Sequence, residues 1–199
     1  MADYHKYVFD EKRRQFLGRF EEMYHAEMQE GFDSWQQEDM RHLSNQISLL
    51  LVNKYNFNAI LDVGCGKGVF THLIKKENNR VTGIDISKTA LKRAQDKFSD
   101  IHFEHADITN FNSSFYKCAY DLIVVKEALS YLQNWGRVLE ELSLIGKYIL
   151  ISLFIPENPI GFVKSERDLA KEVEKHFEIA EKISAQKGRF TIIFGRSRK

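Results

Sequence analysis

Apolar residues along this chain recur at two different spacings, and the two spacings alternate from residue 59 onward. Short β-prone runs occur at residues 59–63, 80–85, 101–107, 120–125 and 147–155. The first of them shows little alternation of apolar and polar residues, which is typical of a strand that is buried on both faces of a parallel sheet. Between most of these runs, apolar residues recur at every third or fourth position, which predicts amphipathic helices. The alternation of strand and helix therefore predicts a doubly wound α/β fold.

The predicted sheet ends in a hairpin. Two further β-prone runs, 177–185 and 189–195, are separated by only three residues, which predicts an antiparallel pair. Before them, Ser165 and Asp168 fit a capping box at the start of a helix, and Ser87 is placed to cap an earlier helix. We therefore expect a Rossmann-like seven-stranded sheet that is mostly parallel, with an antiparallel strand in the C-terminal hairpin.

The first 55 residues have a different pattern. Two sets of apolar residues recur there at helical spacing: Phe16, Phe20, Met23 and Tyr24, and then Met40, Leu43, Ile47, Leu50 and Leu51. They predict two helices that are joined near residues 31–35. We expect a single domain over residues 1–199, in which residues 1–55 form a helical lid or cap on a core of residues 56–199.

Composition narrows the class of partner. The chain has 29 basic and 28 acidic residues, so its net charge predicts neither a nucleic-acid nor a membrane partner. No apolar run approaches the roughly 20 residues that span a bilayer, and the N-terminus lacks the apolar core of a secretory signal. The two cysteines, Cys65 and Cys118, have no metal-ligand spacing. We expect a cytoplasmic protein with reduced thiols and no metal.

Three of the 11 glycines stand at alternate positions directly after the first predicted strand: Gly64, Gly66 and Gly68. A doubly wound sheet binds its ligand at the carboxyl ends of its strands. Without a Cβ atom, the backbone of a glycine can approach a ligand closely, and the helix that follows presents free N–H groups. The pattern favours a ligand-binding turn over a turn that needs glycine for its conformation alone.

The spacing also restricts the ligand. A dinucleotide fingerprint requires glycine or alanine where this chain has Val69, and the segment lacks the gap and the Lys-Ser/Thr pair of a P-loop. Asp85 ends the second strand about 20 residues after the glycines, where a carboxylate accepts the hydroxyls of a ribose. Asp107 ends the third strand and either accepts from an adenine amine or caps a turn, and Ile108 offers an apolar surface. These residues indicate a nucleoside ligand without a pyrophosphate.

Over residues 55–199 the chain resembles the class I S-adenosylmethionine-dependent methyltransferases. The segments LDVGCGKG, GIDIS, HADI and YDLIVVKEALSYL are similar to the first four motifs of that family. The resemblance implies S-adenosylmethionine as cofactor and S-adenosylhomocysteine as product. It also implies a cofactor pocket lined by the backbone around Lys126 and by the following residues: Asp62, Gly64, Cys65, Gly66, Asp85, Ile86, Asp107 and Ile108. Within the superfamily, KEALSYL resembles small-molecule and glycan methyltransferases, including the nodulation N-methyltransferases.

Methyl transfer by in-line displacement depends mainly on the alignment of donor and acceptor, and a general base is optional. Glu127 and Tyr131 are four residues apart, so on a helical turn they share a face. Glu127 either orients the acceptor or bonds the cofactor. Trp35 is either a lid over the cofactor or an anchor for the front helices. His42, two helical turns after Trp35, is either a general base or a surface residue.

The acceptor class follows from what the chain lacks. After the fourth strand it reads VVKEAL, without the Asp/Asn-Pro-Pro-aromatic motif of nucleic-acid amine methyltransferases, and Glu127 is the one acidic candidate for a metal ligand there. We therefore expect a small-molecule or glycan-type acceptor that is selected by the front helices and by the loop 154–165. Two other hypotheses are a non-catalytic, cofactor-binding scaffold or regulator, and a nucleotide-dependent oxidoreductase. Val69 and the acidic adenine position disfavour the oxidoreductase.

Overall fold

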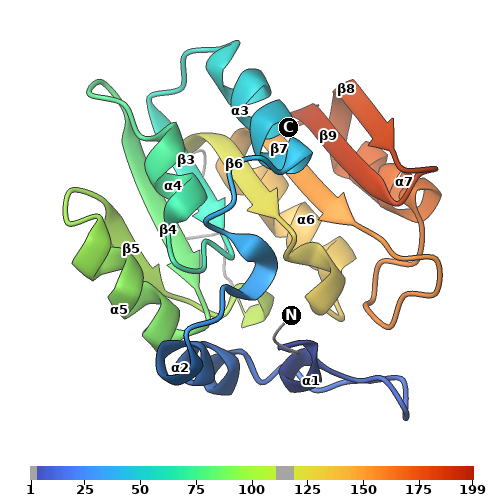
Figure 1. Cartoon of the computed structure of the whole chain (residues 1–199). Coiled ribbons are helices and arrows are strands. Elements are labelled where there is room, and N and C mark those ends of the chain that lie inside the picture. The colour runs from blue at the N-terminus through green and yellow to red at the C-terminus, as the bar shows by residue number, and fades with distance from the viewer. Residues whose placement is uncertain (1–3, 111–118) are drawn as a thin grey trace.

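A seven-stranded sheet forms the centre of the molecule in the computed structural model, which describes residues 4–110 and 119–199 (Figure 1). The strand order is β5-β4-β3-β6-β7-β9-β8. The first five of these strands are mutually parallel, and β9 is antiparallel to both of its neighbours. This confirms the predicted fold. The bounds are β3 (Ala59–Val63), β4 (Arg80–Asp85), β5 (His102–His105), β6 (Tyr120–Lys126), β7 (Gly146–Phe154), β8 (Phe177–Ala185) and β9 (Phe190–Ser197).

Helices cover both faces of this sheet. The helices that follow strands are α4 (Val69–Ile74), α5 (Lys88–Lys97), α6 (Trp135–Ile145) and α7 (Glu166–His176). Two of them begin as predicted: the Ser87 hydroxyl accepts from the backbone N–H of Ala90, and the Ser165 hydroxyl accepts from that of Asp168, each at 3.1 Å. These bonds satisfy N–H groups that the helices themselves leave free.

The hydrophobic core has two parts, one on each face of the sheet. Along β6, Ile123 and Val125 belong to the part that packs against α6 and α7, and Leu122 and Val124 belong to the other. Successive side chains of a strand point to opposite faces, so an uninterrupted apolar run supplies both layers. This explains why the middle of β6, residues 122–125, is entirely apolar.

The front of the chain is less regular than predicted. It contains α1 (His5–Val8), the hairpin strands β1 (Phe9–Asp10) and β2 (Gln15–Phe16), α2 (Phe20–Glu30), the 3₁₀ turn η1 (Ser34–Gln36) and α3 (Leu43–Asn53). The two predicted helices are α2 and α3, but Phe16 lies in β2 and Met40 lies before α3. Gly18 has φ +64° and Arg19 is not helical, so α2 begins only at Phe20.

The parts of the front segment lie in two places. α3 packs against the sheet, where Leu51 and Val52 join the core. α1 and α2 instead lie beyond the carboxyl ends of the parallel strands (Figure 1). There, Met23 and Tyr24 are buried with Val8 among aromatic side chains. Residues 4–42 thus stand over the edge of the sheet where the predicted site residues lie.

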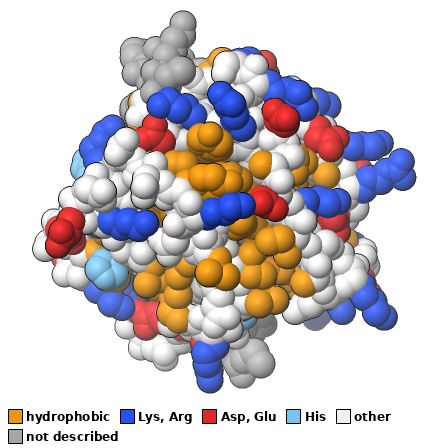
Figure 2. Space-filling model, turned by 90° about the horizontal axis from the view of Figure 1, so that it is seen from above, with side chains coloured by type: hydrophobic (Ala, Val, Ile, Leu, Met, Phe, Trp, Pro, Cys, Tyr) orange, Lys and Arg blue, Asp and Glu red, His pale blue; other side chains and the backbone are white. Residues whose placement is uncertain are grey.

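The surface carries both signs of charge. On the face shown in Figure 2, basic and acidic side chains are interspersed around hydrophobic side chains in its middle. This distribution agrees with the nearly balanced composition of the chain. Within residues 4–110 and 119–199, no helix combines the length and the apolar character that crossing a membrane requires.

Candidate functional site

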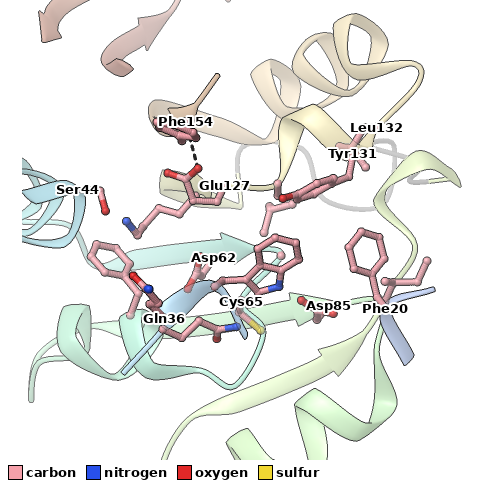
Figure 3. Close-up of a pocket in the computed structure, with 18 of the residues that line it drawn as sticks. Phe20, Gln36, Ser44, Asp62, Cys65, Asp85, Glu127, Tyr131, Leu132 and Phe154 are labelled. Atoms are coloured by element: carbon pink, nitrogen blue, oxygen red, sulfur yellow. Dashed lines mark hydrogen bonds between the residues drawn. The ribbon is translucent and has the colours of Figure 1, made fainter. Parts of the chain in front are cut away.

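A cavity of about 1080 Å³ lies at the carboxyl ends of the parallel strands, beneath residues 4–45 (Figure 3). The structure brings twelve of the thirteen predicted site residues to its wall, and Gly66 is the exception. The twelve are Trp35, His42, Asp62, Gly64, Cys65, Asp85, Ile86, Asp107, Ile108, Lys126, Glu127 and Tyr131. Cys118 lies outside the described residues.

The loop of residues 64–68 follows β3 and has left-handed backbone at all three of its glycines, with φ between 54° and 73°. A Cβ atom on Gly68 would lie 2.6 Å from the Phe103 ring, and one on Gly66 would lie 2.5 Å from the Gln37 side chain. The glycines are therefore required by conformation and by close packing. Gly66 misses the cavity because the front segment covers it.

Asp85, at the end of β4, holds this loop in place. Its Oδ2 accepts from the backbone N–H of Gly66 and its Oδ1 from that of Ser87, each at 2.9 Å. The side chain is buried, and burial raises the pKa of Asp85 even though these hydrogen bonds oppose the rise. The carboxylate therefore has a fixed orientation at the cavity wall.

Two further titratable groups at the cavity wall are Asp62, which is buried, and Lys126, which is partly buried. Asp62 accepts a 2.7 Å hydrogen bond from Thr71 Oγ1, and burial raises its pKa to about 6, although this bond and the charge of Lys126 oppose the rise. Burial also lowers the pKa of Lys126, against the opposing charges of Glu127 and Asp62. The Lys126 ammonium lies 4.7 Å from the centroid of the Phe70 ring, and it forms no ion pair within the part of the chain that the structure describes.

Asp107 caps its own turn. Thr109 donates to its Oδ1 from the backbone N–H at 2.9 Å and from the hydroxyl at 2.7 Å, and the Asn110 amide donates to its Oδ2 at 2.6 Å. Partial burial acts to raise the pKa of Asp107, but these hydrogen bonds outweigh it and hold the pKa below its ordinary value. Next to it, Ile108 and Ile86 present apolar side chains to the cavity, and Ile86 is half exposed.

Glu127 and Tyr131 do not share a helical face, contrary to the prediction. Glu127 has left-handed backbone (φ 53°), and the turn that follows is a 3₁₀ turn, η4 (Leu129–Tyr131). The Glu127 carboxylate accepts from the backbone N–H of Phe154 at 2.8 Å and from Ser152 Oγ at 3.2 Å, and burial raises its pKa. Figure 3 shows Glu127 directed toward Phe154, whereas Tyr131 lies toward Phe20.

Aromatic side chains form one wall of the cavity. The Tyr131 ring centroid lies 5.3 Å from that of Phe20 and 5.4 Å from that of Trp35, and Trp35 also packs against Tyr4 at 4.9 Å. Burial raises the pKa of Tyr131 well above its ordinary value, so this hydroxyl stays protonated. Trp35 thus anchors the front segment and also lines the cavity, and its role as a lid over the cofactor stays a prediction.

His42 reaches the cavity by a different route from the predicted one. Trp35 lies in η1 and His42 lies just before α3, so the two are not successive turns of one helix. His42 is exposed, and its Nε2 contacts the Gln36 side-chain oxygen. Both residues face the same cavity because the chain bends between them.

Nothing in the sequence identified several of the lining residues as part of the site. Tyr24 and Gln37 come from the front segment, and Gln186 and Phe190 come from the C-terminal hairpin. Of the loop 154–165, Phe154 alone is among the described lining residues. That loop holds the front hairpin instead: Arg14 donates to Asn158 Oδ1 at 2.8 Å, and the rings of Phe16 and Phe162 meet edge to face.

The sheet order, the glycine loop and the carboxylates at successive strand ends are those of the class I S-adenosylmethionine-dependent methyltransferases. A family model described as a methyltransferase domain matches residues 57–195, and the chain belongs to this family.

The chain resembles nodulation protein S of Bradyrhizobium diazoefficiens, with 30% identity over 116 residues that cover 57% of this chain and 52% of that protein. It is 27% identical over 122 residues to malonyl-[acyl-carrier protein] O-methyltransferase 2 of Ilyobacter polytropus, covering 57% of this chain and 46% of that one. The chain thus spans about half the length of these curated relatives.

The crystal structure of the N-methyltransferase NodS from Bradyrhizobium japonicum, solved in complex with S-adenosylhomocysteine, has the same fold. It superposes with a TM-score of 0.71 at 19% identity and covers 88% of this chain and 98% of that one.

Asp62 predicts a pH dependence of stability. Its pKa is raised from 3.8 to about 6 in the folded protein, so the stabilisation from its proton is complete below about pH 4 and is lost as the pH rises through about 6. We expect the unfolding free energy of the wild type, minus that of Asp62→Asn, to fall by about 2.4 kcal/mol between pH 4 and pH 7.5. Urea unfolding at a series of pH values measures this difference.

The control is Asp121→Asn, since the hydrogen bond from Lys147 holds the pKa of Asp121 below its ordinary value. The unfolding free energy of the wild type, minus that of Asp121→Asn, does not fall as the pH rises. Equal pH slopes for the wild type and Asp62→Asn would contradict the role of the buried Asp62 carboxyl group.

Proposed function

We propose that this protein transfers a methyl group from S-adenosylmethionine to a small-molecule or glycan-type acceptor. The observation that supports this most directly is the convergence of four strand ends on one cavity. The glycine loop, Asp85, Asp107 and the Lys126–Glu127 segment lie at the carboxyl ends of β3, β4, β5 and β6, and all border it. In this proposal residues 4–42 form the lid.

The residues present fit an adenosyl group. An ionised carboxylate has about four acceptor positions, and Asp85 uses two of them for the backbone N–H groups of Gly66 and Ser87. Its remaining capacity suits the two hydroxyls of a ribose. Ile86 and Ile108 supply apolar surface for the adenine, next to Asp107. A cavity of about 1080 Å³ slightly exceeds the range of roughly 300–1,000 Å³ for small-molecule sites, so an acceptor also has room.

The charge of the cavity suits a cationic ligand. Its lining contains five carboxylates, those of Asp33, Asp62, Asp85, Asp107 and Glu127, and among the described lining residues Lys126 is the one lysine. When bound, S-adenosylmethionine supplies an activated methyl group on a positively charged sulfur. The aromatic faces of Trp35 and Tyr131 can stabilise such a cation.

The chain's own contribution to the reaction is mainly alignment. Holding two reactants in line is worth effective molarities on the order of 10⁵ M or more, and the bonded Asp85 and packed Tyr131 have fixed positions. For an acceptor that must lose a proton, Glu127 is our first candidate base, since burial raises its pKa toward neutrality. His42 is the second, because it is exposed at the cavity.

The acceptor class is supported by one of the chain's relatives. Malonyl-[acyl-carrier protein] O-methyltransferase 2, which is similar over about half of its length, has a carrier-linked malonyl group as the acceptor in its name. The balanced surface charge gives no support for a nucleic-acid acceptor. We therefore propose that residues 4–45 and the C-terminal hairpin select the acceptor, because they supply the cavity wall opposite the strand ends.

Ligand-induced stabilisation tests the cofactor. A ligand at one hundred times its Kd stabilises the folded state by about 2.7 kcal/mol, which for a chain of this size raises Tm by about 5–10 °C. We expect this rise with S-adenosylhomocysteine and none with NAD. Differential scanning fluorimetry measures both. Stabilisation by NAD alone would overturn the proposal and favour an oxidoreductase.

Asp85→Asn tests the ribose role. The substitution keeps the size of the side chain but removes its charge, so we expect S-adenosylhomocysteine to bind more weakly by about 1.5–3 kcal/mol, the range for a hydrogen bond to a charged group. Isothermal titration calorimetry measures the change. Asp96→Asn is the control, since Asp96 is an exposed residue of α5 outside the cavity. An unchanged affinity for Asp85→Asn rules out the ribose role.

Transfer of label separates a catalyst from a scaffold. We expect the wild type, with methyl-labelled S-adenosylmethionine and a metabolite extract of the source organism, to form a labelled product. Glu127→Gln should lower its rate by about 10²–10⁴-fold when Glu127 is the general base, with little change in S-adenosylhomocysteine affinity. Liquid chromatography with scintillation counting detects the product. Tight cofactor binding with no labelled product from any extract would favour the scaffold.

A further inference from the structure

Lys67 lies inside the glycine loop, between Gly66 and Gly68, yet its side chain is only 4% exposed. Its Nζ lies 2.7 Å from Glu27 Oε1 on α2 and 2.6 Å from Asp33 Oδ1. Both acidic residues belong to the front segment, whereas the lysine belongs to the loop that follows β3. The ion pairs therefore join two parts of the chain that are far apart in sequence.

One partner of Lys67 is itself enclosed, whereas the Asp33 side chain is 34% exposed. The Glu27 side chain is fully buried, and it also pairs with Arg93 of α5 at 2.6 Å. Ser34 donates to its other oxygen from the backbone N–H at 3.0 Å and from the hydroxyl. Removal of the Lys67 charge leaves the buried Glu27 carboxylate with one charged partner, Arg93, in place of two, which is more unfavourable than losing an exposed pair.

The backbone of Lys67 makes a second connection to the front segment. Its N–H donates to Gln37 Oε1 at 2.9 Å, and the Gln37 amide donates in turn to the Tyr24 hydroxyl at 2.9 Å. The front segment lies so close that a Cβ atom on Gly66 would meet both Gln37 and Tyr24 at 2.5–2.7 Å. Gln37 and Tyr24 also line the cavity.

We propose that Lys67 is a positioning residue that couples the packing of the front segment against the glycine loop to the conformation of that loop. We call the state in which the two are packed together the seated state. A ligand in the cavity contacts both parts, so it binds to the seated state. The proposal rests on the proposed function only in naming S-adenosylmethionine and its product as that ligand. When the seated fraction falls, the apparent Kd rises in inverse proportion.

The test compares Lys67→Met with Lys97→Met by calorimetry with S-adenosylhomocysteine and by amide hydrogen exchange. Lys97 is the matched control because it also pairs with the front segment, at 3.1 Å from Glu38, but this pair is half exposed. We expect Lys67→Met to raise the Kd at least about tenfold, which corresponds to a seated fraction of about one tenth. We expect Lys97→Met to change it by less than about twofold. Lys67→Arg, which keeps the charge, should restore most of the affinity.

Hydrogen exchange reports the coupling directly, because local opening exposes backbone amides. Without ligand, Lys67→Met should speed exchange in residues 20–42 and 64–68 together and leave β6 and β7 unchanged. An unchanged Kd, or faster exchange in the loop alone, would overturn the proposal.

If Lys67→Met fails to fold, the wild type still decides: S-adenosylhomocysteine must slow exchange in both segments, and slowing in the loop alone refutes the coupling. If the wild type does not bind this ligand, the proposed function fails. The coupling is then tested alone, by comparing hydrogen exchange without ligand in Glu27→Gln with that in the wild type and in Lys67→Arg.

Discussion

The parallel pairing of β3 with both β4 and β6 is the constraint from which the site follows. In register, Val63 lies opposite Ile84 of β4 and opposite Val125 of β6, so the three strands end at one level. The chain proceeds from β3 to β4 and β5 on one side and returns to β6 and β7 on the other. At such a reversal the connections leave to opposite faces of the sheet, and a crevice remains between them. The glycine loop, Asp85 and Lys126 have to meet there.

Sequence periodicity predicts this core well because burial on both faces leaves a simple signature. The runs at 59–63 and 80–85 are the observed bounds of β3 and β4, which are buried along almost their whole length. The run at 177–185 also has the observed bounds of β8, but this edge strand has alternate residues exposed. Ser87 and Ser165 cap helices as predicted, since a cap depends on its immediate neighbours. The residues at the strand ends are equally predictable, because their position follows from the end of each strand and from the direction of the sheet.

The front segment is predicted less well, since tertiary contacts outweigh local pattern there. Phe16 has helical spacing to Phe20, but it lies in β2 and packs against Tyr131 and Phe162 from distant parts of the chain. Trp35 and Glu127 adopt left-handed backbone that their residue types do not indicate. Likewise, nothing in the spacing of Glu27 and Lys67 shows that they are ion-paired, because 40 positions separate them.

The two walls of the cavity are therefore suited to different tasks. At the strand ends, Asp85 is held by the backbone amides of Gly66 and Ser87. Glu127 is held by Ser152 and the amide of Phe154, so both carboxylates are oriented before a ligand arrives. A ligand that uses them does not bear the entropy cost of ordering them. The opposite wall consists of aromatic side chains on short elements, such as Trp35 in η1, whose positions depend on the seating of the whole front segment. Affinity for a shared cofactor is best served by the first wall, and discrimination among acceptors by the second, because only the second can change without altering the sheet.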